Sequence, residues 1–197
     1  LLLTYKKNTI KVVKNSGLPA IIAGLFLSLS FVAYVVAMSK TTVANVVFII
    51  STQTIFLALF GFLFLKEKIT LKGLIAITLA FAGMLVMVGD SINQGTLFGN
   101  LVAFAIPINF TILVMIIRKF PDLDMIPAIF YSGIFSGVYG LLLASNLNFS
   151  TNDIFMGFLL GVPQLAFGFI CVTIGTKTTK AVTVGLLMLL ETIFAPI

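Results

Sequence analysis

Long apolar stretches without charge alternate along the chain with short segments that contain nearly all of the charged residues. A helix rises about 1.5 Å per residue, so about 20 residues of this kind span a bilayer core. The stretches lack the two-residue alternation of apolar and polar positions expected in the strands of a membrane barrel. The pattern therefore predicts seven membrane-spanning helices within residues 18–38, 41–65, 73–89, 97–117, 125–144, 154–176 and 181–197.

The composition agrees with a protein that faces lipid. Of the 197 residues, 60% are hydrophobic and 9% are charged, whereas a soluble domain carries roughly a quarter charged residues. The chain has one Cys and no His, which excludes an internal disulfide, a His/Cys zinc site and a catalytic group that relies on His. A phosphate-binding loop of the GxxxxGK[ST] form is also absent from the sequence. We therefore expect an all-α, polytopic membrane helix bundle that is not an enzyme and uses no metal or cofactor.

The positive charges divide unevenly between the two sides of the membrane that the predicted helices define. One side holds eleven of the twelve Lys and Arg residues, and the other side holds Lys40 alone. Because short loops rich in Lys and Arg remain cytoplasmic, we expect the rich side to face the cytoplasm of a bacterial or archaeal cell. The net charge of +6 thus reflects topology, and no basic stripe with interleaved aromatic residues indicates nucleic-acid binding. The expected cytoplasmic segments are residues 1–16, 66–72, 118–124 and 177–180.

Two short sequence patterns occur twice in the chain. Residues 39–44 (SKTTVA) are similar to 176–181 (TKTTKA), and residues 53–56 (QTIF) are similar to 191–194 (ETIF), at an offset of 137 or 138 residues. The copies belong to helices that are five apart in the chain, an odd number, so we expect the second copy to be inverted in the membrane. Inverted repeats of this kind are typical of transporters whose substrate site lies near the bilayer midplane, where the repeats meet.

The same segments have a resemblance to a known family. The run AMSKTTVAN at 37–45, the sequence LKEK at 65–68 and the segment GMLVM at 83–87 are together similar to an EamA domain, a unit of the drug/metabolite transporter superfamily. Residues 185–196 resemble the corresponding helix of a second EamA domain.

This resemblance implies an architecture of ten helices in two inverted repeats of five. The seven helices of this incomplete chain would be the third to the ninth, and the absent helices would line part of the central cavity. Residues 1–89 would form the last three helices of the first repeat, and residues 97–197 the first four of the second. Thr54 stands where the family often has Pro, so we expect its helix to be less kinked than is usual in the family.

One carboxylate falls inside a predicted span. Glu191 lies about ten residues into the last helix, where a charge costs about 2.5 to 3.5 kcal/mol. Burial at that depth favours the protonated acid, which would suit a proton-coupling group or a partner for a cationic substrate. The alternative is a protonated Glu that makes only a structural hydrogen bond between helices.

Amide side chains occur at comparable depths in other spans. Gln53 is the repeat mate of Glu191, while Asn109 and Gln164 lie inside two helices of the second half. Each is a candidate for substrate contact, and the alternative for each is an ordinary interhelical hydrogen bond worth about 0.6 kcal/mol.

Two prolines lie beside these amides. Pro107 and Pro163 each remove one helical hydrogen bond and are candidates for kinks that take part in gating. Asn45 is close to a helix start, where a capping role is the simpler interpretation. Glu67 lies between Lys66 and Lys68, and we expect a solvated charge cluster there.

The sequence favours a secondary active transporter, by preference an exporter, that moves small metabolites, amino acids or amine-like drugs by alternating access. The spans contain no Lys or Arg that could neutralise a phosphate, so sugar phosphates rank below these solutes. The expected partners are the lipid bilayer and a small-molecule substrate, with or without coupling to protons. The alternative is a passive channel or a structural membrane subunit. The solute, the direction, the coupling ion and the oligomeric state stay open.

Overall fold

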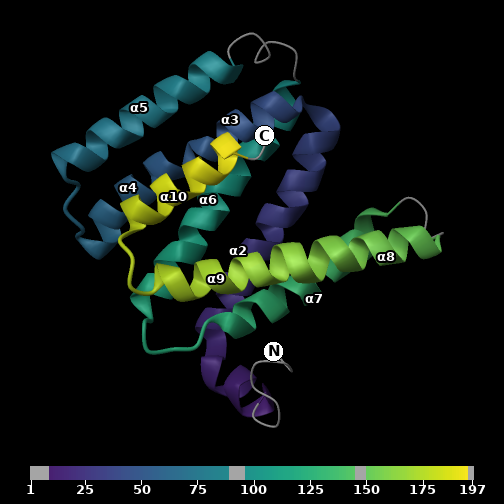
Figure 1. Cartoon of the computed structure of the whole chain (residues 1–197). Coiled ribbons are helices and arrows are strands. Elements are labelled where there is room, and N and C mark those ends of the chain that lie inside the picture. Colours follow the sequence, from purple (N-terminus) through teal and green to yellow (C-terminus); the bar gives the residue numbers. More distant parts are fainter. Residues whose placement is uncertain (1–8, 89–95, 145–149, 195–197) are drawn as a thin grey trace.

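Helices form nearly all of the described part of the chain in a computed structural model, and no strand occurs there (Figure 1). The structure describes the backbone of residues 9–88, 96–144 and 150–194, with side chains described except at 9, 10, 80, 83–88 and 191–194. The helices are α2 (Thr9–Lys40), α3 (Val43–Ser51), α4 (Gln53–Leu65), α5 (Leu71–Val88), α6 (Leu97–Lys119), α7 (Ile126–Leu143), α8 (Thr151–Leu159), the π-helix η3 (Leu160–Ala166), α9 (Phe167–Thr176) and α10 (Ala181–Phe194).

Each of the seven predicted spans contains helix, so the all-α polytopic bundle is confirmed. Among the described residues, five helical segments are long and apolar enough to cross a membrane. A sixth apolar helical segment, Ala181–Leu190, is shorter. The five long segments are Lys11–Lys40, Val43–Leu65, Leu97–Lys119, Ile126–Leu143 and Thr151–Thr176.

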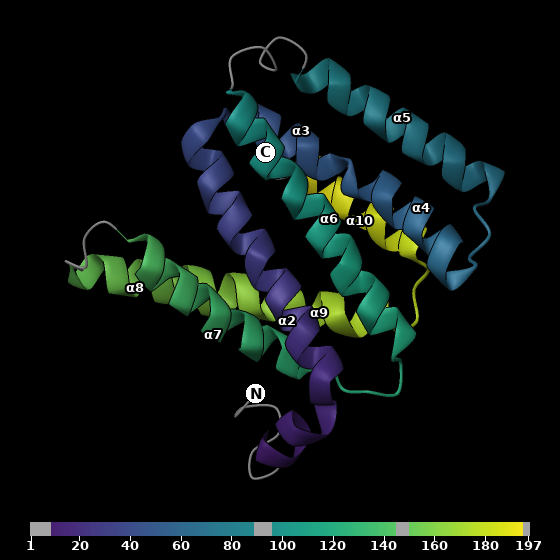
Figure 2. The ribbon, with the colours of Figure 1, turned by 180° about the vertical axis from the view of Figure 1, so that it is seen from behind.

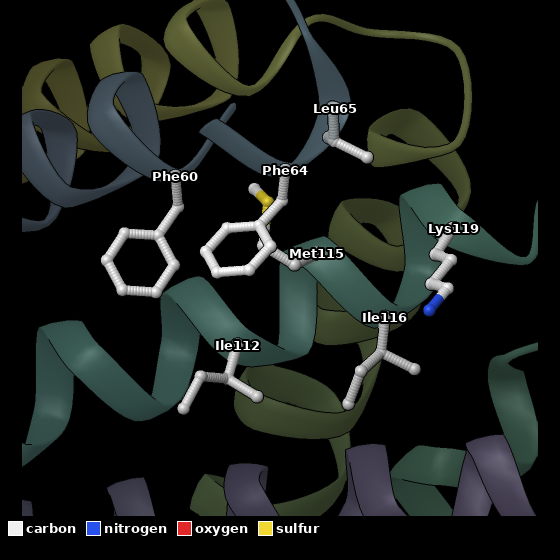
Figure 3. Close-up of a pocket in the computed structure, with 7 residues that line it drawn as sticks. All are labelled: Phe60, Phe64, Leu65, Ile112, Met115, Ile116 and Lys119. Carbon is white, nitrogen blue, oxygen red and sulfur yellow. The ribbon is translucent and has the colours of Figure 1, made fainter. Parts of the chain in front are cut away.

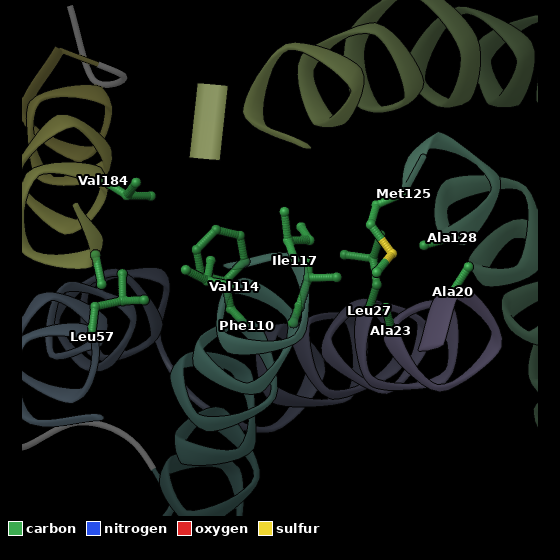
Figure 4. Packing of buried hydrophobic residues seen from close by; sticks show 12 residues of the cluster. Ala20, Ala23, Leu27, Leu57, Phe110, Val114, Ile117, Met125, Ala128 and Val184 are labelled. Carbon is green, nitrogen blue, oxygen red and sulfur yellow. The ribbon is translucent and has the colours of Figure 1, made fainter. Parts of the chain in front are cut away.

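Helix α6 lies at the centre of the bundle and contacts α2, α3, α4 and α9. Its buried positions recur every three or four residues, as expected for the inner face of a helix. Figure 4 shows Phe110, Val114 and Ile117 of α6 in the main cluster, between Leu57 of α4 and Leu27 of α2. Because α6 packs against elements from both ends of the chain, it connects the two predicted repeats.

Small residues allow α2 and α7 to approach closely. A Cβ atom on Gly24 would lie 2.7 Å from the carbonyl oxygen of Ala128 and 2.7 Å from the Cβ of Tyr131. Lipid tails are as apolar as Leu, so helices in a bilayer associate largely by such close van der Waals packing. Together, α7 and the α8–α9 segment form a layer that crosses α2 and α6 obliquely, as both views show (Figures 1 and 2).

The loop predicted over residues 1–16 is wrong for its second half. Helix α2 already begins at Thr9, and of the first 16 residues, 1–8 lie outside the described part of the chain. The helix is broken at Gly17, whose φ of 60° and ψ of −161° are not helical. Glycine accepts such a positive φ at little cost. Pro19, two residues later, is tolerated beside this break because it has no backbone N–H to donate.

The predicted span 41–65 is interrupted at Thr52, between α3 and α4. The expectation that the helix at Thr54 is less kinked than is usual in the family stays a prediction. The hydroxyl groups of Ser51 and Thr52 donate hydrogen bonds to the carbonyl oxygens of Val47 and Ile49, at 2.8 and 2.6 Å. Side chains that bond to the preceding turn compete with the helical ladder and bend helices. Two adjacent hydroxyl residues therefore accompany the break where no proline is present.

The span that contains α8, η3 and α9 departs from regular α-helix around Pro163. Proline cannot donate to the preceding turn, and the seven residues Leu160–Ala166 form a π-helix that accommodates it. The segment starts with a capping box between Ser150 and Asp153. In the most apolar window of this span no residue is buried, so the described part of the chain leaves most of its surface open.

Candidate functional site

The helices that carry the repeated QTIF and ETIF patterns, α4 and α10, pack against each other. The hydroxyl of Thr54 donates a buried hydrogen bond of 2.9 Å to the carbonyl oxygen of Gly185, 131 residues away. A Cβ atom on Gly185 would lie 2.9 Å from the Cα of Thr54. Glycine is therefore needed at this crossing, which brings the backbones of the two predicted repeats into contact.

Gln53, the residue before Thr54, is 6% exposed and lies at the first turn of α4. Its repeat mate Glu191 belongs to α10, but the side chain of Glu191 lies outside the described residues. Gln53 is thus buried next to the residue that contacts α10, and the roles of both residues stay predictions.

A charged cluster joins the Lys-rich ends of α4, α6 and α10. Glu67 forms an ion pair with Arg118, and the two side chains are 9% and 17% exposed. The other terminal nitrogen of Arg118 donates to the carbonyl oxygen of Thr179. The Nε atom of Arg118 is buried and has no partner among the described residues. We call Glu67, Arg118, Thr179 and Ala181 the ionic cluster.

Glu67 also caps α10. Its second carboxylate oxygen accepts a hydrogen bond of 2.9 Å from the backbone N–H of Ala181, the first residue of that helix. A carboxylate is stabilised there by the free N–H groups and by the positive end of the helix dipole. The prediction that Glu67 belongs to a solvated charge cluster is wrong, because Arg118 and α10 cover its side chain.

The backbone around Lys66 explains how Glu67 turns inward. Lys66 ends α4 in the left-handed conformation, with a φ of 55°. The N–H of Glu67 then returns to the carbonyl oxygen of Gly61 at 3.0 Å, which satisfies one of the open carbonyls at the helix end. This tight turn directs Glu67 toward α10 while Lys66 and Lys68 stay exposed.

The same contacts place three Lys-rich loops at one end of the bundle. Glu67 belongs to the loop 66–72, Arg118 to the segment 118–124 and Thr179 to the segment 177–180. In addition, the ammonium group of Lys177 donates to the carbonyl oxygen of Leu123 at 2.6 Å. The positive charges predicted that these loops lie on the same side of the membrane, and the structure places them at the same end of the bundle. That this end faces the cytoplasm stays a prediction.

An uncharged cluster joins α2, α3 and α6 at the opposite end of the bundle. Thr41 donates to the side-chain oxygen of Asn100 at 2.6 Å. The amide nitrogen of Asn45 donates to Thr41 at 3.0 Å and to Asn100 at 3.2 Å. Thr96, the N-cap residue of α6, donates to the carbonyl oxygen of Lys40. We call Thr41, Asn45, Thr96 and Asn100 the amide cluster.

The predicted capping role of Asn45 is wrong. The N-cap residue of α3 is Thr42, which accepts a 3.2 Å bond from the N–H of Asn45. The Asn45 side chain, in a residue 2% exposed, instead faces α6, and its oxygen has no partner among the described residues. Gly99 permits this approach, because a Cβ there would lie 2.7 Å from the carbonyl carbon of Lys40.

Pro107 and Asn109 lie near the middle of α6. Pro107 is buried, and its carbonyl oxygen accepts a bond of 2.7 Å from the hydroxyl of buried Thr111. Asn109 is half-buried. The carbonyl that Pro107 leaves without a helical donor is that of Ala103, four residues earlier. The Thr111 bond therefore does not satisfy it, and the proposed gating and substrate roles stay predictions.

Gln164 and Pro163 are exposed in the π-helix η3. The structure does not bring them together with Gln53 or Asn109. Among the described residues, no group of three or more His, Cys, Asp and Glu side chains could hold a metal ion.

Comparison with known proteins bears on the first half of the chain. Residues 1–89 match the EamA-like transporter family. The match covers less than half of the chain, and we call residues 1–89 the EamA-like domain. The resemblance noted in the sequence is therefore confirmed over these residues, and the family is one of membrane transporters and, in general, not of enzymes. No curated protein and no solved structure matches the chain.

Both clusters and the α4–α10 crossing contain contacts that link the EamA-like domain to the rest of the chain. Glu67, Asn45 and Thr54 belong to residues 1–89, while their partners Arg118, Asn100 and Gly185 follow that domain. The two parts are therefore joined at both ends of the bundle and at one crossing between them.

Proposed function

We propose that the chain belongs to a secondary active transporter that moves small metabolites, amino acids or amine-like solutes by alternating access. In this proposal, residues 1–89 and 97–197 belong to two inverted EamA repeats. The match of residues 1–89 to a family of transporters supports the general class. The solute, its direction and the coupling to protons are parts of the proposal.

The observation that carries the proposal is the buried contact between α4 and α10. These helices hold the two copies of the repeated sequence, and the hydroxyl of Thr54 bonds to the backbone of Gly185 where they cross. Transporters built from inverted repeats bind their substrates near the midplane, at the interface between the repeats. Gln53, the residue before Thr54, and Glu191 on α10 are therefore the proposed substrate or coupling residues.

The two polar clusters supply candidate gates. Alternating access requires that contacts between the repeats break at one end of the bundle while those at the other end hold. The ionic cluster and the amide cluster lie at opposite ends of α6, and each contains residues from both proposed repeats. In this proposal, opening either cluster exposes the α4–α10 crossing to one side of the membrane.

The chemistry of the spans guides the choice of solute. The spans predicted from the sequence offer amide and hydroxyl groups but no Lys or Arg, and Arg118, just beyond the end of one of them, is paired with Glu67. A multiply charged phosphate would need several cations or helix N-termini for its recognition. Amines and amino acids are therefore preferred over sugar phosphates.

Transport by the chain in reconstituted vesicles tests this proposal. With an imposed pH gradient, we expect saturable uptake of a radiolabelled amine or amino acid from a mixed panel. Replacing Glu191 by Gln should abolish the dependence on the gradient, whereas replacing the exposed Asn152 by Ala should leave uptake unchanged. Uptake that does not saturate would indicate a channel. A pH dependence that survives Glu191→Gln would contradict the coupling role.

A further inference from the structure

A groove of about 300 Å³ lies between α4 and α6, apart from the α4–α10 crossing. Apolar side chains form its walls, and a single Lys stands at one end (Figure 3). The lining residues are Phe60, Phe64, Leu65, Ile112, Met115, Ile116 and Lys119.

Two aromatic rings form one wall of this groove. The rings of Phe60 and Phe64 lie one helical turn apart on α4, with centroids separated by 5.3 Å. Figure 3 shows them opposite Ile112 and Ile116 of α6. Phe64 is 68% exposed, so the described part of the chain leaves the groove open on its outer side. Both helices belong to apolar segments long enough to cross a membrane, so lipid chains are available at this surface.

Lys119 is the one charged residue that lines the groove. It is exposed at the last position of α6, and its ammonium group lies 5.9 Å from the ring centroid of Phe120. The groove also ends at Leu65, the last residue of α4, which Lys66 follows directly. The positive end of the groove therefore coincides with the end of the span, where lipid headgroups lie.

We propose that this groove is a binding site for an anionic phospholipid of the leaflet at the Lys-rich end. One acyl chain lies along Phe60, Phe64 and Ile112, and the phosphate-containing headgroup pairs with Lys119. Lipid tails are as apolar as the groove, so the chain fixes the position of the lipid but does not distinguish one phospholipid from another. The selection comes from charge, and this site is independent of the proposed transport function.

The attraction between Lys119 and an anionic headgroup sets the expected preference for anionic over zwitterionic lipid. One Lys near an anionic membrane surface favours binding by about fivefold, and salt reduces this preference. A zwitterionic lipid keeps the same chain contacts but gains much less from Lys119. We therefore expect about fivefold stronger occupancy by phosphatidylglycerol than by phosphatidylcholine at low salt.

The absence of Trp from the sequence provides a sensitive test. Phe64→Trp places a single Trp in the wall of the groove. The variant is reconstituted in phosphatidylcholine vesicles that contain a fixed small fraction of either phosphatidylglycerol or phosphatidylcholine with brominated chains, which quench Trp fluorescence on contact. We expect the anionic brominated lipid to quench about fivefold more effectively at low salt. Adding Lys119→Gln should abolish this difference, and Lys119→Arg should preserve it.

A matched control uses Phe62→Trp, on the same helix but outside the groove. Phe62 is exposed, so general lipid contact should quench this Trp equally with both lipids. Equal quenching of Phe64→Trp by the two lipids, or an equal anionic preference at Phe62→Trp, would overturn the proposal. Failure of both lipids to quench Phe64→Trp would also overturn it, because the groove would then be covered by protein. Circular dichroism of each variant establishes that the helices are retained.

Discussion

The two ends of α6 are joined to the EamA-like domain by contacts of different chemistry. At the Lys-rich end, Arg118 makes a largely buried ion pair with Glu67, which also caps α10. At the opposite end, Asn100 and Thr96 make uncharged hydrogen bonds to α2 and α3. Removing one partner of a buried ion pair leaves an uncompensated charge, whereas hydrogen bonds between membrane helices average about 0.6 kcal/mol.

This difference indicates which end opens more easily. Separation of the ionic cluster must break an ion pair and a helix cap together, so it needs compensation by water or by a ligand. The amide cluster can exchange its bonds for bonds to water at small cost, and the Asn45 oxygen already lacks a partner among the described residues. We therefore expect the amide end to open first and the ionic end to remain closed until the amide end closes again.

The largest expected effect is that of Glu67→Ala. The variant leaves Arg118 without its partner and the N-terminus of α10 without its cap, which should lower the free energy of unfolding by about 3 kcal/mol. This value is at the low end for a buried ion pair, because Arg118 is 17% exposed. Unfolding by SDS in mixed micelles measures the change.

The control for Glu67→Ala is Asp122→Ala, which removes an exposed acidic residue at the same end of the bundle. This control should alter the free energy of unfolding by less than about 0.5 kcal/mol. If the two variants were equally stable, the ionic cluster would not hold the two parts of the chain together.

A smaller effect is expected for Asn45→Ala. The variant loses two donated hydrogen bonds but also removes a buried oxygen without a partner among the described residues. The net loss in the free energy of unfolding should be about 0.6 kcal/mol, measured by the same SDS titration. The exposed Asn152→Ala provides the baseline. A loss as large as that of Glu67→Ala would remove the proposed asymmetry between the two ends.

The sequence predicted the helices well because charge is excluded from lipid whatever the tertiary packing is. The distribution of Lys and Arg also predicted which loops share an end of the bundle, as the contact between Glu67 and Arg118 bears out. The helix break at Thr52 could not be predicted in this way, since it depends on how two hydroxyl groups bond to the preceding turn rather than on a Pro.

The sequence could not predict the polar clusters for a related reason, since they also depend on tertiary contacts. Glu67 lies between two Lys residues, a pattern typical of a solvent-exposed segment, and its partner Arg118 is 51 residues away. Asn45 lies 55 residues from Asn100, and each amide alone resembles a residue near a helix end. A signal did exist for Glu67, because it directly follows a span and one Arg stands at the end of another span on the same side. The repeated segments, by contrast, predicted a relation between α4 and α10, and these helices are in contact.

Two distances, each between a pair of spin labels beside one cluster, test most directly whether the clusters act as separate gates. In a Cys171→Ser background, which removes the exposed free cysteine, one sample carries labels at Lys68→Cys and Thr178→Cys beside the ionic cluster. A second sample carries them at Ser39→Cys and Leu97→Cys beside the amide cluster. All four positions are exposed, and pulsed electron spin resonance measures each distance in lipid vesicles. We predict that adding Glu67→Gln lengthens the distance beside the ionic cluster and leaves the distance beside the amide cluster unchanged. Lengthening of both distances together, or of neither, would contradict the account.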